Sequence, residues 1–303
     1  MKIQSITVIG LGLIGGSIAL ALKQGGFEGT IVGCDFPDVL AVAGRRGAID
    51  AAEQDRVRAV SSSQLVVLAA PVAANRKLLG EIAPHVPEGA LITDAGSTKA
   101  DISAEAGAVF GPNFLRRFLP GHPMAGKEVS GMEHADAGLF RNAPWVLTPP
   151  GGRNALIDPA LSRGVHSEFI AWLERIGARV VVTTAETHDR VLAYTSHLPQ
   201  VLSTALAACV SEAVGEEPAL RELSGRALRD MIRLAKSNPQ VWAEISAANR
   251  ENLGEAIERL ERQLAALRTA LGTEIFREEF ARARQFDPDA ELVRDDTDPP
   301  KFR

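Results

Sequence analysis

Three glycines near the start of the chain have the spacing of a loop that binds a dinucleotide. They stand in the run Gly10-Leu11-Gly12-Leu13-Ile14-Gly15, between a strand-like segment at residues 6–9 and a helical pattern that reaches Leu22. In such a loop the first glycine permits a tight turn, the second lets the backbone approach the pyrophosphate, and the third allows close helix packing. The N–H groups at the helix start, including those of Leu13 and Ile14, then point at the phosphates.

An acidic residue ends the next predicted strand. Residues 30–34 form an apolar run that leads into Asp35. A carboxylate in this place accepts hydrogen bonds from the 2′-hydroxyl of a ribose and repels the 2′-phosphate of NADP. No Arg or Lys follows until Arg45 and Arg46. The expected cofactor is therefore NAD, and the alternative is an aspartate that only forms a turn.

A proline, a serine and a histidine each follow a further apolar segment. They are Pro71, Ser97 and His122, after strands expected at residues 65–70, 90–93 and 118–119. Open α/β sheets bind ligands beyond the carboxyl ends of their strands. We therefore expect Pro71 to border the cofactor, and Ser97 and His122 to face its nicotinamide.

The elements that must position these residues alternate between strand and helix. This alternation runs from residue 2 to about residue 150 and predicts a parallel sheet covered on both faces. Residues 145–147 are another strand, residues 151–164 are a loop, and a helix at 169–176 with a strand at 179–182 completes the domain. The fold class is thus α/β, with a Rossmann-type doubly wound parallel sheet in residues 1–184.

Residues 185–286 are predicted to form an all-α domain for substrate binding and dimerisation. A helix is expected at residues 189–214, kinked at Pro199, and another at 222–235. Asn238 and Pro239 are the N-cap and first residue of a long helix that reaches about Leu271.

Apolar residues on that long helix recur at spacings of three and four. They are Ile257, Leu260, Leu264, Leu267 and Leu271. Such a seam needs a second helix, from this chain or from another copy. A homodimer is favoured because few other helices remain to cover the seam. Residues 287–303 are charged and contain proline, and we expect them to form a mobile tail.

Composition excludes several other classes of protein. The chain has 303 residues, enough for two domains, and its net charge of −5 with no dense basic cluster argues against nucleic acid as a partner. Cys34 and Cys209 lie far apart and have no metal-ligand spacing. No apolar run is long enough to span a membrane, and no secretory signal precedes the first strand. We expect a cytoplasmic protein without a metal.

Four motifs after the glycine loop resemble, in their order, those of the prephenate/arogenate dehydrogenase family of tyrosine biosynthesis. They are Asp94-Ala95-Gly96-Ser97-Thr98-Lys99, Gly121-His122-Pro123-Met124-Ala125-Gly126, Ser196-His197-Leu198-Pro199, and Arg233-Leu234-Ala235-Lys236-Ser237 followed by Trp242. The resemblance extends from the N-terminus to about residue 280. One such motif means little, whereas four in this order on a Rossmann-type start are specific.

The resemblance implies oxidative decarboxylation of a cyclohexadienol such as prephenate. Hydride passes from the ring carbon that bears the hydroxyl to NAD, carbon dioxide leaves, and the ring becomes aromatic. His122 is the expected base, because a neutral imidazole with a pKa near about 6.5 can accept the hydroxyl proton. Ser97 resembles the family serine that hydrogen-bonds the hydroxyl and this histidine. The alternatives are a structural histidine and an N-cap serine.

Arg233 is the expected ligand of a substrate carboxylate, because its planar guanidinium can bind one with two hydrogen bonds. The alternative is a surface arginine paired with an acid. Glu128 resembles a family acid that gates the site by pairing with this arginine, or else it is a solvated loop residue. Asp189 resembles a family acid near the substrate, or it caps the start of its helix.

Ser196 and His197 stand beside the expected kink and are further candidates for binding substrate, although His197 could equally pack between helices. In many family members the residue three after this histidine is a second histidine that helps to hold a substrate carboxylate. Gln200 stands there instead, which puts the side-chain specificity in doubt. Trp242 lines the pocket in the family, with core packing as the alternative.

Three readings compete with a prephenate dehydrogenase. Arogenate carries an ammonium in place of the side-chain keto group, and Gln200 could offer it an amide oxygen. A nucleotide-sensing relative would keep the fold without turnover, but the presence of His122, Ser97 and Arg233 together argues against it. A β-hydroxyacid dehydrogenase would need a catalytic lysine, yet Lys236, within the family motif, is the only lysine between Lys127 and Lys301.

Overall fold

The computed structural model describes residues 2–152, 162–215, 217 and 219–287. Contacts divide the chain into two compact units, residues 1–254 and residues 255–303. The tail expected from residue 287 falls outside the described residues from 288 onward, as does most of the loop expected at 151–164.

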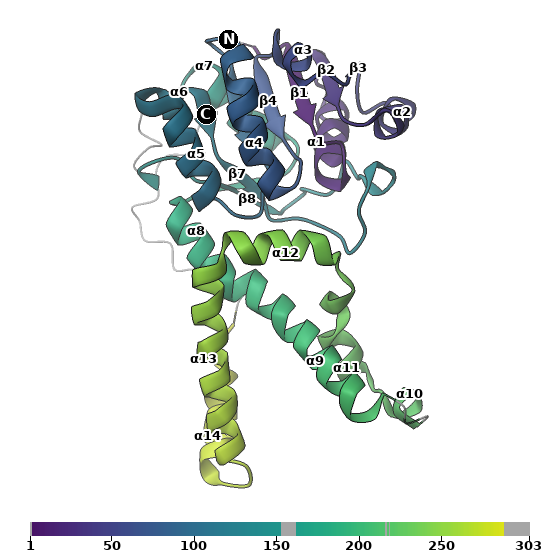
Figure 1. The fold of residues 1–303 in the computed structure, drawn as a ribbon, viewed down its shortest axis with the longest axis vertical. Helices are drawn as coiled ribbons and strands as arrows, with labels where there is room; N and C mark the ends of the chain where they lie inside the picture. The colour runs from purple at the N-terminus through teal and green to yellow at the C-terminus, as the bar shows by residue number, and fades with distance from the viewer. Residues whose placement is uncertain (1, 153–161, 216, 218, 288–303) are drawn as a thin grey trace. The chain divides into compact units, whose positions relative to one another are not determined.

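Six parallel strands form the main sheet of the first unit (Figure 1). In chain order they are β1 (Ser5–Ile9), β2 (Thr30–Cys34), β3 (Ala51–Glu53), β4 (Leu65–Leu68), β5 (Leu91–Asp94) and β6 (Phe118–Leu119). Their order across the sheet is β3-β2-β1-β4-β5-β6. The winding reverses between β1 and β4, so their carboxyl ends border the crevice where such sheets bind ligands. The predicted Rossmann-type fold is confirmed.

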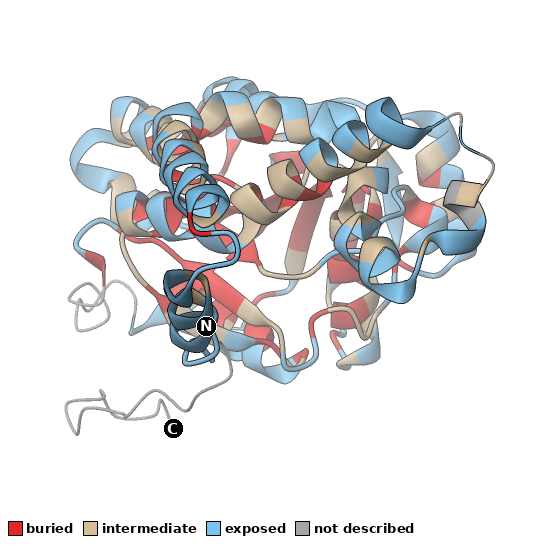
Figure 2. Cartoon of the chain, turned by 90° about the horizontal axis from the view of Figure 1, so that it is seen from below, coloured by how far each residue is buried: buried red, intermediate tan, exposed pale blue. Residues whose placement is uncertain are grey.

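Helices cover both faces of this sheet. They are α1 (Leu13–Gln24), α2 (Pro37–Arg45), α3 (Arg56–Val60), α4 (Val72–Ile82), α5 (Ala100–Phe110), α6 (Phe114–Arg117) and α7 (Gly164–Arg175), with 3-10 turns η1 (Ala83–His85), η2 (Gly111–Asn113) and η3 (Met132–His134). One hydrophobic core packs α1, α2 and α7 against the strands, and a second core packs α3, α4 and α5. Figure 2 shows the buried positions concentrated in the strands and the exposed positions on the outer sides of the helices.

The last three strands of this region form a separate small sheet. They are β7 (Gly121–Pro123), β8 (Pro144–Leu147) and β9 (Arg179–Val182), with β7 antiparallel and β9 parallel to β8. The sequence predicted β8 and β9 as strands of the first domain, but it predicted neither β7 nor a second sheet. Pro120 separates β6 from β7, and it has no N–H to donate to a strand ladder. The N–H of Gly121 instead bonds the Asp94 carboxylate at the end of β5.

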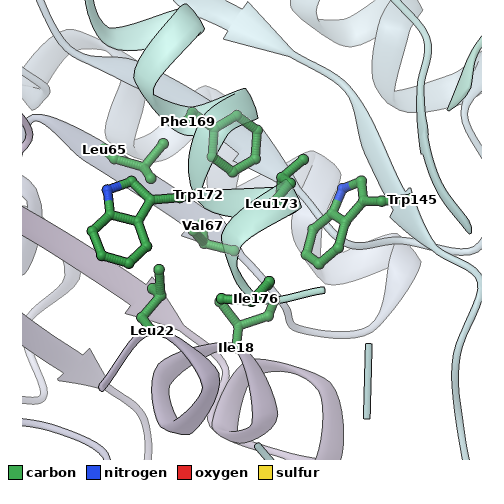
Figure 3. A pocket seen from close by; sticks show the side chains of 9 residues that line it. All are labelled: Ile18, Leu22, Leu65, Val67, Trp145, Phe169, Trp172, Leu173 and Ile176. Atoms are coloured by element: carbon green, nitrogen blue, oxygen red, sulfur yellow. The ribbon is translucent and has the colours of Figure 1, made fainter. Parts of the chain in front are cut away.

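A small gap remains in the core between α1, α7 and β8 (Figure 3). Its volume is about 10 Å³. Only apolar and aromatic side chains line it, namely Ile18, Leu22, Leu65, Val67, Trp145, Phe169, Trp172, Leu173 and Ile176. A gap with such a lining stays dry. It is therefore a packing gap and not a ligand site.

The rest of the described chain is helical, as predicted. Its elements are α8 (Ala185–Leu192), the π-helix η5 (Ala193–His197), α9 (Leu198–Val214), α10 (Ala219–Leu223), α11 (Arg226–Met231), the 3-10 turn η6 (Arg233–Lys236), α12 (Pro239–Ala248), α13 (Arg250–Thr269) and α14 (Glu274–Ala283). Among the described helices, none combines the length and the apolar character needed to cross a bilayer.

Three of the predicted helices are interrupted. The π-helix precedes Pro199, which lacks the N–H that an α-helix would donate to the carbonyl four residues earlier. The helix expected at residues 222–235 is divided, because α10 ends at Leu223, α11 runs from Arg226 to Met231, and a tighter 3-10 turn begins at Arg233. The long helix from Asn238 ends at Ala248, because Asn249 leaves the helical region with φ −119° and ψ 33°.

Candidate active site

A cavity of about 720 Å³ opens at the carboxyl ends of β1, β2 and β4. Four of the residues predicted to bind a cofactor line it, namely Gly10, Gly12, Asp35 and Pro71. The other three, Leu13, Ile14 and Gly15, form the first turn of α1. That helix starts with no side-chain cap and no acidic residue in its first turn. Its N-terminal N–H groups therefore remain suited to an anion.

The three glycines of the loop are needed for different reasons. Gly10 has φ 90°, and a Cβ there would lie 2.6 Å from the backbone nitrogen of Ala70. A Cβ on Gly15 would overlap the carbonyl oxygen of Gly10. A Cβ on Gly12 would meet nothing within 4 Å. Because the chain itself does not need that space, the missing side chain leaves room for a bound group, which fits a pyrophosphate.

Asp35 is held in place by two backbone N–H groups. Its carboxylate accepts from Leu11 at 2.6 Å and from Phe36 at 2.7 Å, which links β2 to the glycine loop. These contacts fix the carboxylate on the cavity wall and leave it further lone pairs for a ribose hydroxyl. The position therefore suits the role that the sequence assigned to Asp35.

Two cations line the same cavity, although neither stands close to Asp35 in the sequence. Arg56 comes from α3 and pairs with Glu81 at 3.0 Å. Lys77 comes from α4, and among the described residues it makes no hydrogen bond or ion pair. The sequence offered no local signal for either, because only the packing of α3 and α4 brings them to the end of β2.

His122 lies on β7 and is bonded to a histidine that the sequence analysis did not single out. His122 Nδ1 lies 2.9 Å from His188 Nε2, and His188 Nδ1 lies 2.7 Å from an Asp189 carboxylate oxygen. All three side chains are buried. His122 Nε2 has no hydrogen-bond partner in the described part of the chain. The adjacent His188-Asp189 dipeptide was the only available sequence signal.

Asp189 caps a helix, but not its own. It accepts the N–H of Lys99 and the N–H of Ala100, each at 2.8 Å, at the start of α5. The N-cap of α8 is Thr184, whose side chain accepts from Thr187. Asp189 therefore joins α8 to α5 and brings His188 against His122.

A buried ion pair anchors the start of β7. Lys99 is fully buried, and its ammonium pairs with Asp94 and donates to the Gly121 carbonyl at 2.7 Å. Asp94 in turn accepts the N–H of Gly121 at 3.2 Å. Burial lowers the pKa of Lys99, while Asp94 opposes the shift. These contacts hold the backbone at Gly121, the residue directly before His122.

The surroundings of His122 keep its imidazole neutral. Burial is the main reason that its pKa lies well below 6.5, and repulsion from His188, Lys99 and His197 adds to the effect. An imidazole that is neutral at physiological pH can accept a proton. Its free Nε2 is the atom in position to do so.

His197, on the π-helix, has one satisfied nitrogen and one that is not. The amide of Asn249 donates to His197 Nδ1 at 3.1 Å and to the Asp189 carbonyl at 2.7 Å. Because an amide nitrogen can only donate, neutral His197 carries its proton on Nε2. That atom is buried without a partner among the described residues. Burial lowers the pKa of His197 to about 4, with Asp189 opposing.

Gln200 also presents an unsatisfied buried atom. Its amide nitrogen donates to the carbonyl of Leu234 at 2.8 Å, while its oxygen has no partner in the described chain. Since a carbonyl can only accept, this contact fixes which end of the amide is free. The ring of Trp242 stands 6.0 Å from that of His197 at 78°. Trp242 thus packs beside His197, while Gln200 contacts the turn that follows α11.

Arg233 pairs with Glu128, and both side chains are largely exposed. The turn that carries Arg233 is tied to α9 by Gln200 and by the Ser203 hydroxyl, which accepts the N–H of Ala235. Ser97 and Ser196 are half-buried and make no side-chain hydrogen bond within the described residues. In particular, no bond joins Ser97 to His122, whose Nδ1 bonds His188 instead.

The fold and the glycine loop together define a class, a nucleotide-binding protein with a Rossmann-type sheet. Residues 18–163 match the family described as prephenate dehydrogenase, nucleotide-binding domain. Residues 184–284 match that described as prephenate dehydrogenase, dimerization domain. The chain belongs to the prephenate dehydrogenase family.

The relatives of this chain have names that refer to different substrates. The chain is 34% identical over 93% of its length to a prephenate dehydrogenase of Lactococcus lactis, of which it covers 77%. It is 33% identical over 89% of its length to a cyclohexadienyl dehydrogenase of Zymomonas mobilis, of which it covers 89%.

Solved structures show the same similarity. A prephenate dehydrogenase from A. aeolicus, in complex with hydroxyphenyl propionate and NAD+, superposes with a TM-score of 0.83 at 29% identity. The match covers 94% of this chain and 96% of the other. Synechocystis arogenate dehydrogenase gives a TM-score of 0.74 at 28% identity, with coverages of 93% and 96%.

Proposed function

We propose that this protein is an NAD-dependent prephenate dehydrogenase, which converts prephenate to 4-hydroxyphenylpyruvate and carbon dioxide in tyrosine biosynthesis. The observation that carries the proposal is the buried, neutral imidazole of His122 with its free Nε2. The similarity to enzymes named prephenate dehydrogenase supports the substrate. The A. aeolicus relative, solved with NAD+ and hydroxyphenyl propionate, supports the cofactor and an aromatic acid as ligand.

NAD fits the cavity of the first unit. Gly12 leaves space for the pyrophosphate, and Asp35 offers a fixed carboxylate to a ribose diol. The same carboxylate disfavours the extra phosphate of NADP, and Arg56 is already paired with Glu81. When bound, NAD accepts the hydride that the ring carbon gives up.

The residues of the chain handle the proton and the charge of the reaction. His122 Nε2 accepts the proton of the substrate hydroxyl while the carbon that bears it loses hydride. The low pKa of His122 keeps this nitrogen unprotonated before the reaction. Ser97, half-buried with an unbonded hydroxyl after β5, orients the substrate hydroxyl. As carbon dioxide leaves, the electron pair of its bond passes through the ring to the former hydroxyl oxygen, which takes the proton back from His122 Nε2 to give the phenol.

Arg233 binds a carboxylate of the substrate. Its present partner, Glu128, has a lowered pKa, first through its own backbone N–H and then through Arg233. An ion pair between largely exposed side chains contributes little stability. A substrate carboxylate can therefore take the place of Glu128, with two hydrogen bonds to the guanidinium. Glu128 then acts as a gate that opens when substrate binds.

Arogenate is the second candidate, and the free oxygen of Gln200 favours it. A keto acid offers only acceptors to this region, so the oxygen of Gln200 would stay unsatisfied. The ammonium of arogenate can donate to this oxygen, and a carboxylate can accept from His197 Nε2. On this basis Gln200→His is expected to shift the ratio of kcat/KM values toward prephenate.

The test compares the two substrates on one preparation. NADH formation is followed with prephenate and with arogenate, and the two kcat/KM values are compared. We expect prephenate to be preferred, and a preference for arogenate by tenfold or more would replace the first candidate with the second. His122→Asn should lower kcat by about 10²- to 10⁴-fold with NAD affinity unchanged. NAD binding without turnover of either substrate would contradict both candidates and favour a nucleotide-sensing protein.

The partner that we propose is a second copy of this chain, bound through the C-terminal helices. The dimerization-domain match over residues 184–284 supports it. None of the five seam residues predicted from Ile257 to Leu271 is buried, and Leu264 and Leu271 are exposed at 51% and 64%. Ile275 and Phe280 on α14 are also exposed. Large apolar side chains left open in this number are typical of an interface.

A further inference from the structure

We propose that His188 and Asp189 are positioning residues, which hold the proton of His122 on Nδ1 and share the charge that forms when Nε2 is protonated. The proposal rests on the proposed role of His122 as the base. It follows from the unbroken series of contacts from His122 Nδ1 to His188 and on to Asp189, at 2.9 Å and 2.7 Å.

The tautomers follow from what each atom can do. An ionised carboxylate only accepts, so His188 must carry its proton on Nδ1, which faces Asp189. The Nε2 of neutral His188 then has a lone pair and accepts from His122 Nδ1. His122 therefore carries its proton on Nδ1, and its Nε2 holds the lone pair that faces the reacting hydroxyl. With the opposite tautomer, His122 could not act as a base.

The proton balance is closed within these three groups. The substrate O–H bond breaks, and its proton forms a new bond to His122 Nε2. The resulting imidazolium can pass its Nδ1 proton to His188 Nε2, which leaves a neutral His122 with its proton on Nε2. The positive charge then lies on His188 beside the Asp189 carboxylate. When carbon dioxide leaves, the phenolate oxygen takes the proton of His122 Nε2, and His188 returns its Nε2 proton to His122 Nδ1. Both histidines then end in the protonation state in which they began.

The structure also shows why Asp189 stays ionised and can stabilise the positive charge on His188. Its carboxylate accepts the N–H groups of Lys99 and Ala100 at the start of α5, at 2.8 Å each. A helix N-terminus stabilises negative charge. His122 itself is faced by His188, Lys99 and His197, all of which disfavour its protonation. Asp189 is thus the group that offsets the positive charge formed during the reaction.

The first experiment reads the tautomers directly, without substrate or cofactor. Long-range nitrogen-15 NMR of the histidine rings in the full-length protein at neutral pH should show His122 and His188 both protonated on Nδ1. His188→Phe should remove the preference of His122 for that tautomer. A His122 with its proton on Nε2 in the unmodified protein would overturn the proposal.

The second experiment tests whether the pair acts through His122. His188→Phe and Asp189→Asn should each lower kcat by about 10²-fold or more, with KM changed much less. In the His122→Asn background, adding His188→Phe should change kcat by less than threefold, because the group it serves is already absent. A further large loss in that background would indicate a structural role and contradict the proposal.

Two variants serve as controls: one removes a buried histidine, and the other alters an exposed carboxylate that is hydrogen-bonded. His166→Phe removes a buried histidine on α7 that bonds the Leu115 carbonyl, and Asp50→Asn alters a carboxylate that accepts from Lys23 and the N–H of Ile31. Both should leave kcat within threefold. If His122→Asn retains turnover, His122 is not the base and that part of the proposed function is wrong. The NMR experiment still tests, independently of activity, whether His188 sets the tautomer of His122. If His122→Asn is inactive and His188→Phe is not, only the positioning role is lost.

Discussion

At the scale of single residues, His122 should determine how activity depends on acid. Burial, with repulsion from His188, Lys99 and His197, holds its pKa well below 6.5. The base must be unprotonated, so the active form persists at lower pH than for an ordinary histidine. We expect kcat/KM, which reports the free enzyme, to stay flat from neutral pH to 6.5 and to fall only below that value. An acid limb centred at or above pH 6.5 would contradict this assignment.

Arg233 should affect binding more than turnover. We expect Arg233→Ala to raise KM for the substrate by about 10- to 100-fold with a smaller change in kcat, since a hydrogen-bonded charge pair is lost in both ground and transition states. Steady-state kinetics with saturating NAD measure both constants. Arg226→Ala is the control, because this highly exposed arginine pairs only locally with Asp230. An unchanged KM in Arg233→Ala would exclude the carboxylate clamp.

Sequence alone identified His122 because it stands after a strand within a recognisable motif, but it did not identify His188. A buried histidine has no local pattern that marks its partner, since the bond to His122 forms only when α8 packs beside β7. Arg56 and Lys77 were missed for the same reason. Conversely, Asp35 was found because it directly follows a strand-like run of residues, β2, in the chain.

At the scale of elements, the turn between β1 and α1 should contain one glycine that is needed for cofactor binding and another that is needed for folding. Gly12 has an ordinary φ of −72° and open space where a Cβ would be. Gly12→Ala should therefore leave the melting temperature unchanged and weaken NAD binding by about tenfold or more. Gly15→Ala should destabilise the fold itself by roughly 1–3 kcal/mol, because the new methyl meets the Gly10 carbonyl.

Thermal melts of the two variants without cofactor, followed by NAD titrations, check this pair of expectations. The informative result is the contrast, since both substitutions add one methyl group within four positions of each other. Equal losses of melting temperature would show that Gly12 also serves the fold, and unchanged NAD affinity in Gly12→Ala would place the pyrophosphate elsewhere.

Most elements were predictable from apolar periodicity, and the interruptions were not. The run from Asn238 reads as one helix, but Asn249 ends it in order to bond His197 and Asp189. Likewise the apolar runs of β8 and β9 do not indicate which sheet these strands join, and Gly121–Pro123 has no strand pattern. That choice depends on Pro120 and on the distant Asp94 carboxylate.

At the scale of the whole molecule, assembly should depend on the last helices. Ile275 and Phe280 are exposed at 59% and 57%. We expect the unmodified protein to sediment at twice the mass of the chain, and Ile275→Asp with Phe280→Asp to shift it toward the single-chain mass. Val109→Asp, at an exposed apolar position on α5, is the control and should not change the mass. A single-chain mass for the unmodified protein would contradict the proposed dimer.

The π-helix from Ala193 to His197 determines which sequence changes this stretch of the chain can tolerate. Each residue of a helix turns the chain by about 100°. Removing one residue here would therefore rotate His197 and the residues after it by about that angle about the helix axis, relative to the residues before the π-helix. Tyr194 and Thr195 face solvent, and their side chains serve no contact that the site needs. Substitutions at these two positions should therefore be tolerated. An insertion or deletion between Ala193 and His197 should not be, because it would displace the site residues and abolish activity although every site residue is still present.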